Sequence, residues 1–298
     1  MAHDHADAPS DPRRAFAIGI ALNVTFAAAE VGFGLWANSL ALLADAGHNL
    51  GDVLGLLLAW GASYLSGRPP TVRRTYGLRR SSILAALLNG VLLLVAVGGI
   101  AWEAVRRFGR PAPVADVTVI VVAAAGVLVN TATALLFAAG RKRDLNVRAA
   151  FLHMAADAGI SAAVVLSGVA MRFTGWPAID PATSLLIAVV IAVGTWGLLR
   201  DAMDLALDAV PSTIDIAQVE AYLAGLPGVV AVHDLHVWGL STAHAALTAH
   251  LVKPDGRLDD ELLARAAAEL RARFGIDHAT LQLERAVDHA CDLGPPHG

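Results

Sequence analysis

Six long apolar runs constrain the fold of this chain more than any other feature of its sequence. Each run has about the 20 residues that a helix needs to cross roughly 30 Å of hydrocarbon. A composition of 56% hydrophobic and 16% charged residues is also too apolar for a soluble chain of 298 residues. We therefore expect an all-α domain of six transmembrane helices, embedded in the lipid bilayer. The runs cover residues 15–37, 40–64, 82–105, 114–139, 149–173 and 182–199.

The last third of the chain differs in charge and in pattern. Residues 1–200 hold 16 Lys and Arg against 11 Asp and Glu, whereas residues 201–298 hold 6 against 15. The pattern there predicts an αββαβ order, which indicates a small open sheet with helices on one face. The elements are expected at 214–226, 229–238, 243–252, 258–274 and 278–285. We place a flexible tail at 1–12, the membrane domain at 13–205, the soluble domain at 206–286 and a C-terminal tail at 287–298.

The loops between the apolar runs indicate the orientation in the membrane. The loop after the second run and the loop after the fourth carry five and four Lys or Arg, whereas the other three carry none, three and one. Basic loops stay in the cytoplasm, so we expect both termini there. No short apolar segment with a cleavage site precedes the first run, so we expect no cleaved signal peptide. A single cysteine, Cys291, excludes an intramolecular disulfide framework, and nothing indicates nucleic-acid binding.

Ionisable residues lie inside two of the apolar runs, where each costs at least a few kcal/mol. His48 and Asp52 are four residues apart, and His153 and Asp157 repeat the spacing. Residues at i and i+4 share a helix face, so two imidazoles and two carboxylates can meet between two helices. Four such N and O donors suit a tetrahedral divalent metal such as Zn²⁺. The alternative is interhelical hydrogen bonding, but one dication would neutralise both matched pairs at once.

Two points about this cluster stay open at the sequence level. Asp45 lies three residues before His48, and it is a ligand, a residue that orients His48 from outside the ligand set, or a helix-packing residue. The two pairs also differ in depth, because His48 is nine residues past Ser39 while His153 is only five past the preceding arginine. They align if the second span extends into the cytosol or if the fifth helix begins near Asn146.

Transport fits such a cluster better than catalysis. The sequence has neither a His-Glu-x-x-His motif nor a nucleophile elbow. Four protein donors would leave no open position for a metal-bound water. Metal and protons compete for the same donors, which favours a proton-coupled carrier of divalent cations. Two alternatives remain, an intramembrane metalloenzyme and a metal sensor that binds without transport.

The sequence resembles the cation diffusion facilitator family of metal transporters over nearly its whole length. The resemblance implies a homodimer, with six spans and a cytoplasmic ferredoxin-like domain per protomer. It further implies proton-coupled export of Zn²⁺ from the cytoplasm, with cadmium or cobalt as secondary substrates, and we expect a bacterial inner membrane. His48, Asp52, His153 and Asp157 fall on the family's transport-site positions. The motifs are SLALLADAGHNLGD (39–52), the pair at 153 and 157, RTYGLRRS (74–81), HDLHVW (233–238) and TLQLE (280–284).

The resemblance also implies a second zinc site in the cytoplasmic domain. His233, His250 and Glu284 match positions where family members bind regulatory zinc at the dimer contact, with His278 as a candidate fourth ligand. The alternative is that these are ordinary surface or core residues. Some members carry an Asp and two His between the second and third spans, but residues 67–77 here contain no His. We therefore expect no metal in that loop.

Overall fold

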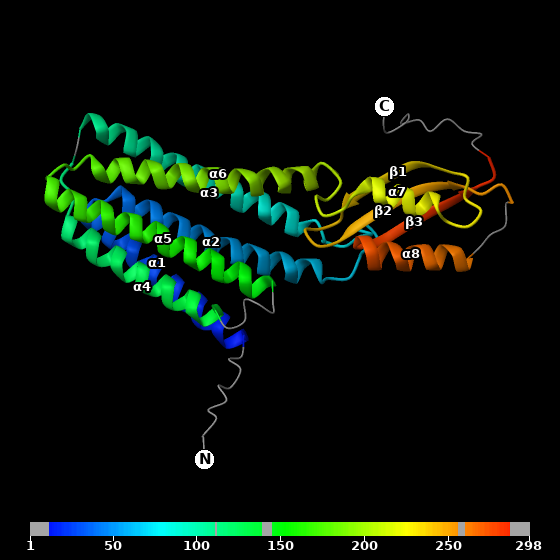
Figure 1. Cartoon of the computed structure of the whole chain (residues 1–298), viewed down its shortest axis with the longest axis horizontal. Helices are drawn as coiled ribbons and strands as arrows, with labels where there is room; N and C mark the ends of the chain where they lie inside the picture. Colours follow the sequence, from blue (N-terminus) through cyan, green and yellow to red (C-terminus); the bar gives the residue numbers. More distant parts are fainter. Residues whose placement is uncertain (1–11, 111, 139–144, 256–259, 287–298) are drawn as a thin grey trace, which may run out of the picture. The chain divides into compact units, whose positions relative to one another are not determined.

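The computed structural model describes residues 12–110, 112–138, 145–255 and 260–286 (Figure 1). Within these residues a helical region precedes a domain with a small sheet, as the sequence predicts. The expected tails at 1–12 and 287–298 lie outside the described residues, except for Pro12. The long helices are α1 (Pro12–Ala37), α2 (Leu40–Ser66), α3 (Ser81–Gly109), α4 (Asp116–Ala138), α5 (Leu145–Thr174) and α6 (Ile179–Ala206). The later elements are α7 (Ile216–Ala224), β1 (Ala231–Gly239), β2 (Ala245–Val252), α8 (Asp260–Phe274) and β3 (Ile276–Glu284).

Four of the described helices, α3, α4, α5 and α6, are long and apolar enough to cross a membrane. The described part of α1 adds a shorter apolar helix from Ala21 to Ala37. Helix α2 is as long as the others, but Asp45, His48 and Asp52 interrupt its apolar sequence. The chain divides into two compact units, residues 1–56 with 89–196 and residues 57–88 with 197–298.

In the first unit, α4 and α5 pack against each other (Figure 1). At Gly168 of α5 an added Cβ would lie 2.7 Å from the Cγ1 atom of Ile120 and 3.3 Å from its backbone nitrogen. The neighbouring backbone cannot move away as a flexible side chain could. The contact between the two helices therefore depends on the absence of a side chain at this position.

We expect Gly168→Val to destabilise this helix pair by about 1–3 kcal/mol through overpacking. The apparent midpoint of thermal unfolding in detergent should fall. Gly159→Val makes the same substitution on the same helix, where an added Cβ would meet nothing within 4 Å. Equal losses in the two variants would assign the effect to helix propensity rather than to packing.

The first turn of α2 is fixed by a carboxylate from another helix. Asp180 of α6 accepts hydrogen bonds from the hydroxyl of Ser39 and, at 2.8 Å, from the backbone N–H of Leu40. Arg107 of α3 donates to the backbone carbonyl of Asn38 at 2.6 Å. The bond from Leu40 satisfies an N–H group that a helix start leaves unpaired, and the three bonds together hold the start of the helix that carries His48 and Asp52.

In the second unit the sheet has the order β1-β2-β3, with β1 and β2 antiparallel and β2 and β3 parallel. The parallel pair needs a crossover, which α8 supplies. Helices α7 and α8 contact each other and the sheet, and their core includes Val219, Leu223, Leu247, Leu251 and Leu270. The register pairs His233 with His250 and Val252 with Glu284. Both histidines and Glu284 are thereby brought to neighbouring positions on the sheet.

Candidate metal-binding sites

Helices α2 and α5 bring two imidazoles and two carboxylates together inside the first unit. His48 Nε2 lies 3.3 Å from Asp157 Oδ1, and His153 Nε2 lies 3.2 Å from Asp52 Oδ2. Within each helix the His–Asp distance is 3.7 Å. The two imidazole centroids are 6.1 Å apart. The structure therefore brings all four predicted residues together.

The pairing follows from two i, i+4 pairs on helices that run in opposite directions. The histidine that comes first on one helix then faces the aspartate that comes second on the other. Helix α5 begins at Leu145, close to Asn146, which is one of the two arrangements that would bring the pairs to one depth. The extra turn before Arg148 makes up for the short distance between that residue and His153.

Three of the four side chains, those of Asp52, His153 and Asp157, line a cavity of about 360 Å³ in the first unit. Asp157 is 1% exposed, whereas the side chain of His153 is 45% exposed. Among the described residues, no Lys or Arg forms an ion pair with Asp52 or Asp157. Their charge is therefore left to a bound cation or to protons. The cavity is lined by Asp52, His153 and Asp157, together with Asn23, Asn49 and Asn89.

Asp45 does not join these four residues. Its carboxylate is fully buried and accepts a 2.8 Å hydrogen bond from the hydroxyl of Ser161 on α5. Ser161 lies one turn after Asp157, so the bond ties α2 to α5 beside the cluster. This geometry favours a supporting role over ligation. Sequence analysis did not identify Ser161, although its spacing from Asp157 places it on the same face of α5.

A second polar contact lies behind the cluster. Glu30 of α1 is fully buried and accepts a 3.1 Å hydrogen bond from the side-chain amide of Asn49. It does not line the cavity that reaches Asp52 and His153. Glu30 therefore anchors α1 to α2 one residue after His48.

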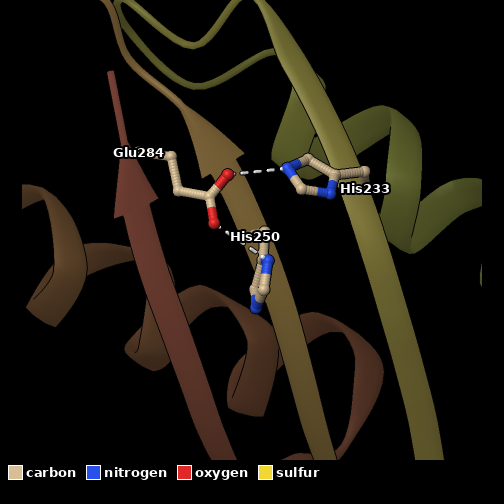
Figure 2. A group of neighbouring side chains, drawn as sticks. All are labelled: His233, His250 and Glu284. Carbon is tan, nitrogen blue, oxygen red and sulfur yellow. Dashed lines mark hydrogen bonds and ion pairs between the residues drawn. The ribbon is translucent and has the colours of Figure 1, made fainter. Parts of the chain in front are cut away.

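In the sheet, His233, His250 and Glu284 form a second cluster (Figure 2). Glu284 Oε2 lies 2.9 Å from His233 Nε2, and Glu284 Oε1 lies 3.1 Å from His250 Nδ1. Figure 2 shows the carboxylate between the two imidazoles, one oxygen toward each. The donor atoms of the three residues fit within 4.8 Å of one another, close enough to share one ion.

The surroundings of Glu284 favour its charged form. Partial burial raises the pKa of this carboxyl, but the hydrogen bonds with His233 and Gln282 lower it. The lowering is the larger effect, so the pKa lies below its ordinary value. A carboxylate that is ionised at neutral pH can bind a cation without first losing a proton.

The structure does not bring His278 to this cluster. His278 lies six residues before Glu284 on β3, where it pairs with Ala246 rather than with a residue near His250. Its ring instead packs edge-on against Tyr76, with centroids 5.6 Å apart. Since a strand rises about 3.3 Å per residue, the two ends of β3 cannot contribute to one coordination sphere within this chain. The prediction of His278 as a fourth ligand is therefore wrong for a site within one chain.

Asp234 is a residue of this region that sequence analysis missed. It lies at a bulge of β1, with φ of 51° in the left-handed region. The bulge turns its carboxylate toward two histidines, with Oδ1 3.1 Å from His236 Nε2 and Oδ2 3.6 Å from His250 Nε2. Its position between His233 and His236 was the only sequence signal, and the bulge that gives it this role depends on pairing with β2.

Four helices long and apolar enough to cross a membrane, together with two clusters of side chains that could hold a metal ion, indicate an integral membrane protein that handles metal cations. Comparison with known proteins agrees. Residues 16–205 match the family model of the cation efflux transmembrane domain, and residues 211–286 match that of the cation efflux protein cytoplasmic domain. The chain belongs to the cation efflux family, the cation diffusion facilitators named above. It is accordingly a metal-cation transporter and not an enzyme.

Several curated relatives are similar over nearly their full length. The metal cation efflux system protein CzcD of Cupriavidus metallidurans is 36% identical, over 97% of this chain and 91% of that protein. The zinc transporter ZitB of Escherichia coli is 36% identical, over 98% and 95%. A cadmium, cobalt and zinc/H⁺-K⁺ antiporter of Bacillus subtilis is 30% identical, over 95% and 92%. A solved metal-bound C-terminal domain of a CzcD transporter is 38% identical, covers 24% of this chain and 99% of that domain, and has a TM-score of 0.22.

Proposed function

We propose that this protein exports divalent cations, chiefly Zn²⁺, from the cytoplasm in exchange for protons. The observation that carries the proposal is the crossed set of two imidazoles and two carboxylates between α2 and α5, of which Asp52, His153 and Asp157 line a cavity. Relatives that align over nearly the whole chain are named as zinc transporters and as a cadmium, cobalt and zinc antiporter, which supports zinc with cadmium or cobalt as further substrates.

In this proposal His48, Asp52, His153 and Asp157 bind the transported ion. Two nitrogen and two oxygen donors match the preference of Zn²⁺ for four-coordinate sites. Imidazole must be neutral and carboxylate ionised to bind the metal, so metal binding and protonation exclude each other. Alternating exposure of the cluster to the two sides would then couple outward movement of metal to inward movement of protons.

The cluster of His233, His250 and Glu284 is proposed as a regulatory zinc site. Three protein ligands leave one position for a water or for a further residue. The domain that carries it is acidic, with 15 Asp and Glu against 6 Lys and Arg after residue 200. Two such domains repel each other, and bound dications would offset that repulsion. We propose that cytosolic zinc thereby tightens a homodimer, an arrangement that the match to the family's cytoplasmic domain supports.

The remaining architecture is proposed as the sequence indicates. Six spans occupy residues 13–205, with α1 and α2 as the first two, and the ferredoxin-like αββαβ domain occupies residues 206–286. Both termini lie in the cytoplasm, and the protein resides in the inner membrane of a bacterial cell. The basic loops on either side of α3 and α4 support this orientation.

Everted membrane vesicles test the transport proposal directly. Vesicles whose interior has been acidified by respiration should take up ⁶⁵Zn²⁺, because protons leave as zinc enters. Collapse of the pH gradient with nigericin should stop this uptake while zinc binding to the purified protein persists. Uptake that continues at the same rate after the gradient collapses would contradict proton coupling, and binding without any uptake would indicate a sensor.

A further inference from the structure

The turn between α2 and α3, residues 67–80 and here called the arginine turn, concentrates positive charge. No Asp or Glu occurs anywhere between Asp52 and Glu103. The turn also lacks the histidines that would make it a metal site. Any carboxylate that pairs with these arginines must therefore come from outside this part of the sequence, as Asp208 does for Arg80. The basic residues are Arg68, Arg73, Arg74, Arg79 and Arg80.

The arginine turn has a defined conformation. Thr71 and Arg74 exchange two backbone hydrogen bonds of 3.0 Å, and the N–H of Gly77 donates to the carbonyl of Arg74 at 2.9 Å. Gly77 has φ of 72°, and an added Cβ would lie 3.2 Å from the carbonyl oxygen of Arg68. Glycine is therefore required for this close approach. All five arginines are exposed on this folded turn.

Four of these arginines line a hollow of about 510 Å³ within the second unit. Arg80 is paired with Asp208, whereas Arg73, Arg74 and Arg79 have no ion-pair partner among the residues that the structure describes. Guanidinium groups bind phosphate oxygens with two parallel hydrogen bonds, so unpaired arginines around one hollow form a phosphate-binding arrangement. The hollow is lined by Arg73, Arg74, Arg79, Arg80, Tyr76 and Trp238.

Apolar side chains beside the hollow indicate what carries the phosphate. Val72, next to Arg73 in the chain, is fully exposed, and Leu84 in the first turn of α3 is 63% exposed. The guanidinium of Arg68 lies 5.5 Å from the ring centroid of the exposed Tyr64 at the end of α2. Free phosphate would use only the arginines, whereas a phospholipid would also cover the apolar side chains.

We propose that the arginine turn binds the headgroup of an anionic phospholipid at the cytoplasmic surface of the membrane. The turn joins two membrane helices, so its residues lie where headgroups are found. Basic segments next to membrane helices attract anionic lipids, with each Lys or Arg adding to the affinity. This site is separate from both metal clusters, and it uses the orientation proposed above.

Native mass spectrometry of the purified full-length protein in a neutral detergent tests this site. Phosphatidylglycerol should bind several-fold more tightly than phosphatidylcholine. Arg73→Gln combined with Arg79→Gln should weaken phosphatidylglycerol binding by about tenfold, because two charges that face the headgroup are lost. Inorganic phosphate at the same concentration should displace little of the lipid.

Arg106→Gln combined with Arg110→Gln is the matched control, because it removes the same charge at the other end of α3. This control should keep its preference for phosphatidylglycerol. Equal losses in the two double variants, or none in the first, would overturn the proposal. Displacement of the lipid by inorganic phosphate would indicate a simple anion site and overturn it as well. A smaller dimer fraction with unchanged lipid binding would assign the arginines to a protein contact instead.

Discussion

Asp157→Asn is expected to reduce zinc transport by about 100-fold or more. Asp157 is buried between both histidines, 3.3 Å from His48 and 3.7 Å from His153. Its loss would remove one of the four proposed ligands and leave both imidazoles without a carboxylate on that side. Asparagine keeps the shape of the side chain, but its amide cannot match the charge that a divalent cation requires. The measurement is the initial rate of ⁶⁵Zn²⁺ uptake into everted vesicles at matched protein levels.

Asp116→Asn is the matched control for that substitution. Asp116 lies at the start of α4, partly exposed and 3.9 Å from Arg172, away from the cluster. The Asp116→Asn variant should transport zinc at close to the wild-type rate. Size-exclusion profiles of both variants should match that of the unmodified protein. A transport rate for Asp157→Asn within about twofold of the wild-type rate would show that the buried carboxylate is not a ligand.

Glu284→Gln is expected to abolish tight zinc binding in the cytoplasmic domain. Glu284 bridges His233 and His250, and glutamine preserves its size while removing the charge that favours a dication. Because the membrane cluster is proposed to bind zinc as well, zinc binding should be compared between Asp157→Asn and Asp157→Asn combined with Glu284→Gln. Equilibrium dialysis should show about 100-fold weaker binding in the double variant.

Glu261→Gln serves as the control for this second prediction. Glu261 is exposed on α8, where it lies 4.0 Å from Arg265. It is not one of the three residues that form the cluster. Added to Asp157→Asn, it should leave the remaining zinc binding unchanged. If Glu284→Gln leaves it unchanged too, the three residues of the sheet do not form a zinc site.

The sequence predicted those features of the fold that depend on local pattern. Apolar runs of membrane length became helices, and the second run, expected at 40–64, became α2 at Leu40–Ser66. The elements after residue 210 appear in the predicted order, with ends that differ by a few residues. The pairs at 48 and 52 and at 153 and 157 were recognisable because an i, i+4 spacing is a property of a single helix.

Features that depend on contacts between distant segments could not be predicted from the sequence. The separation of His278 from Glu284 follows from the register of β2 against β3, which no local pattern specifies. The role of Asp234 follows from a bulge in β1, and the role of Asp45 from its contact with Ser161 on another helix. In each case residue type indicated a polar role, while the partner was set by tertiary packing.

The crossed pairs of α2 and α5 have a consequence for the electrostatic balance of the site. With both imidazoles protonated and no metal, the two positive and two negative side chains sum to zero. With both imidazoles neutral and one dication bound, the sum is again zero. Only the bare, unprotonated form would place two uncompensated negative charges in a low-dielectric medium, where their cost is high. In the proposed transporter, the helix pair could therefore rearrange inside the bilayer with either two protons or one metal ion bound. Rearrangement with neither bound would be disfavoured.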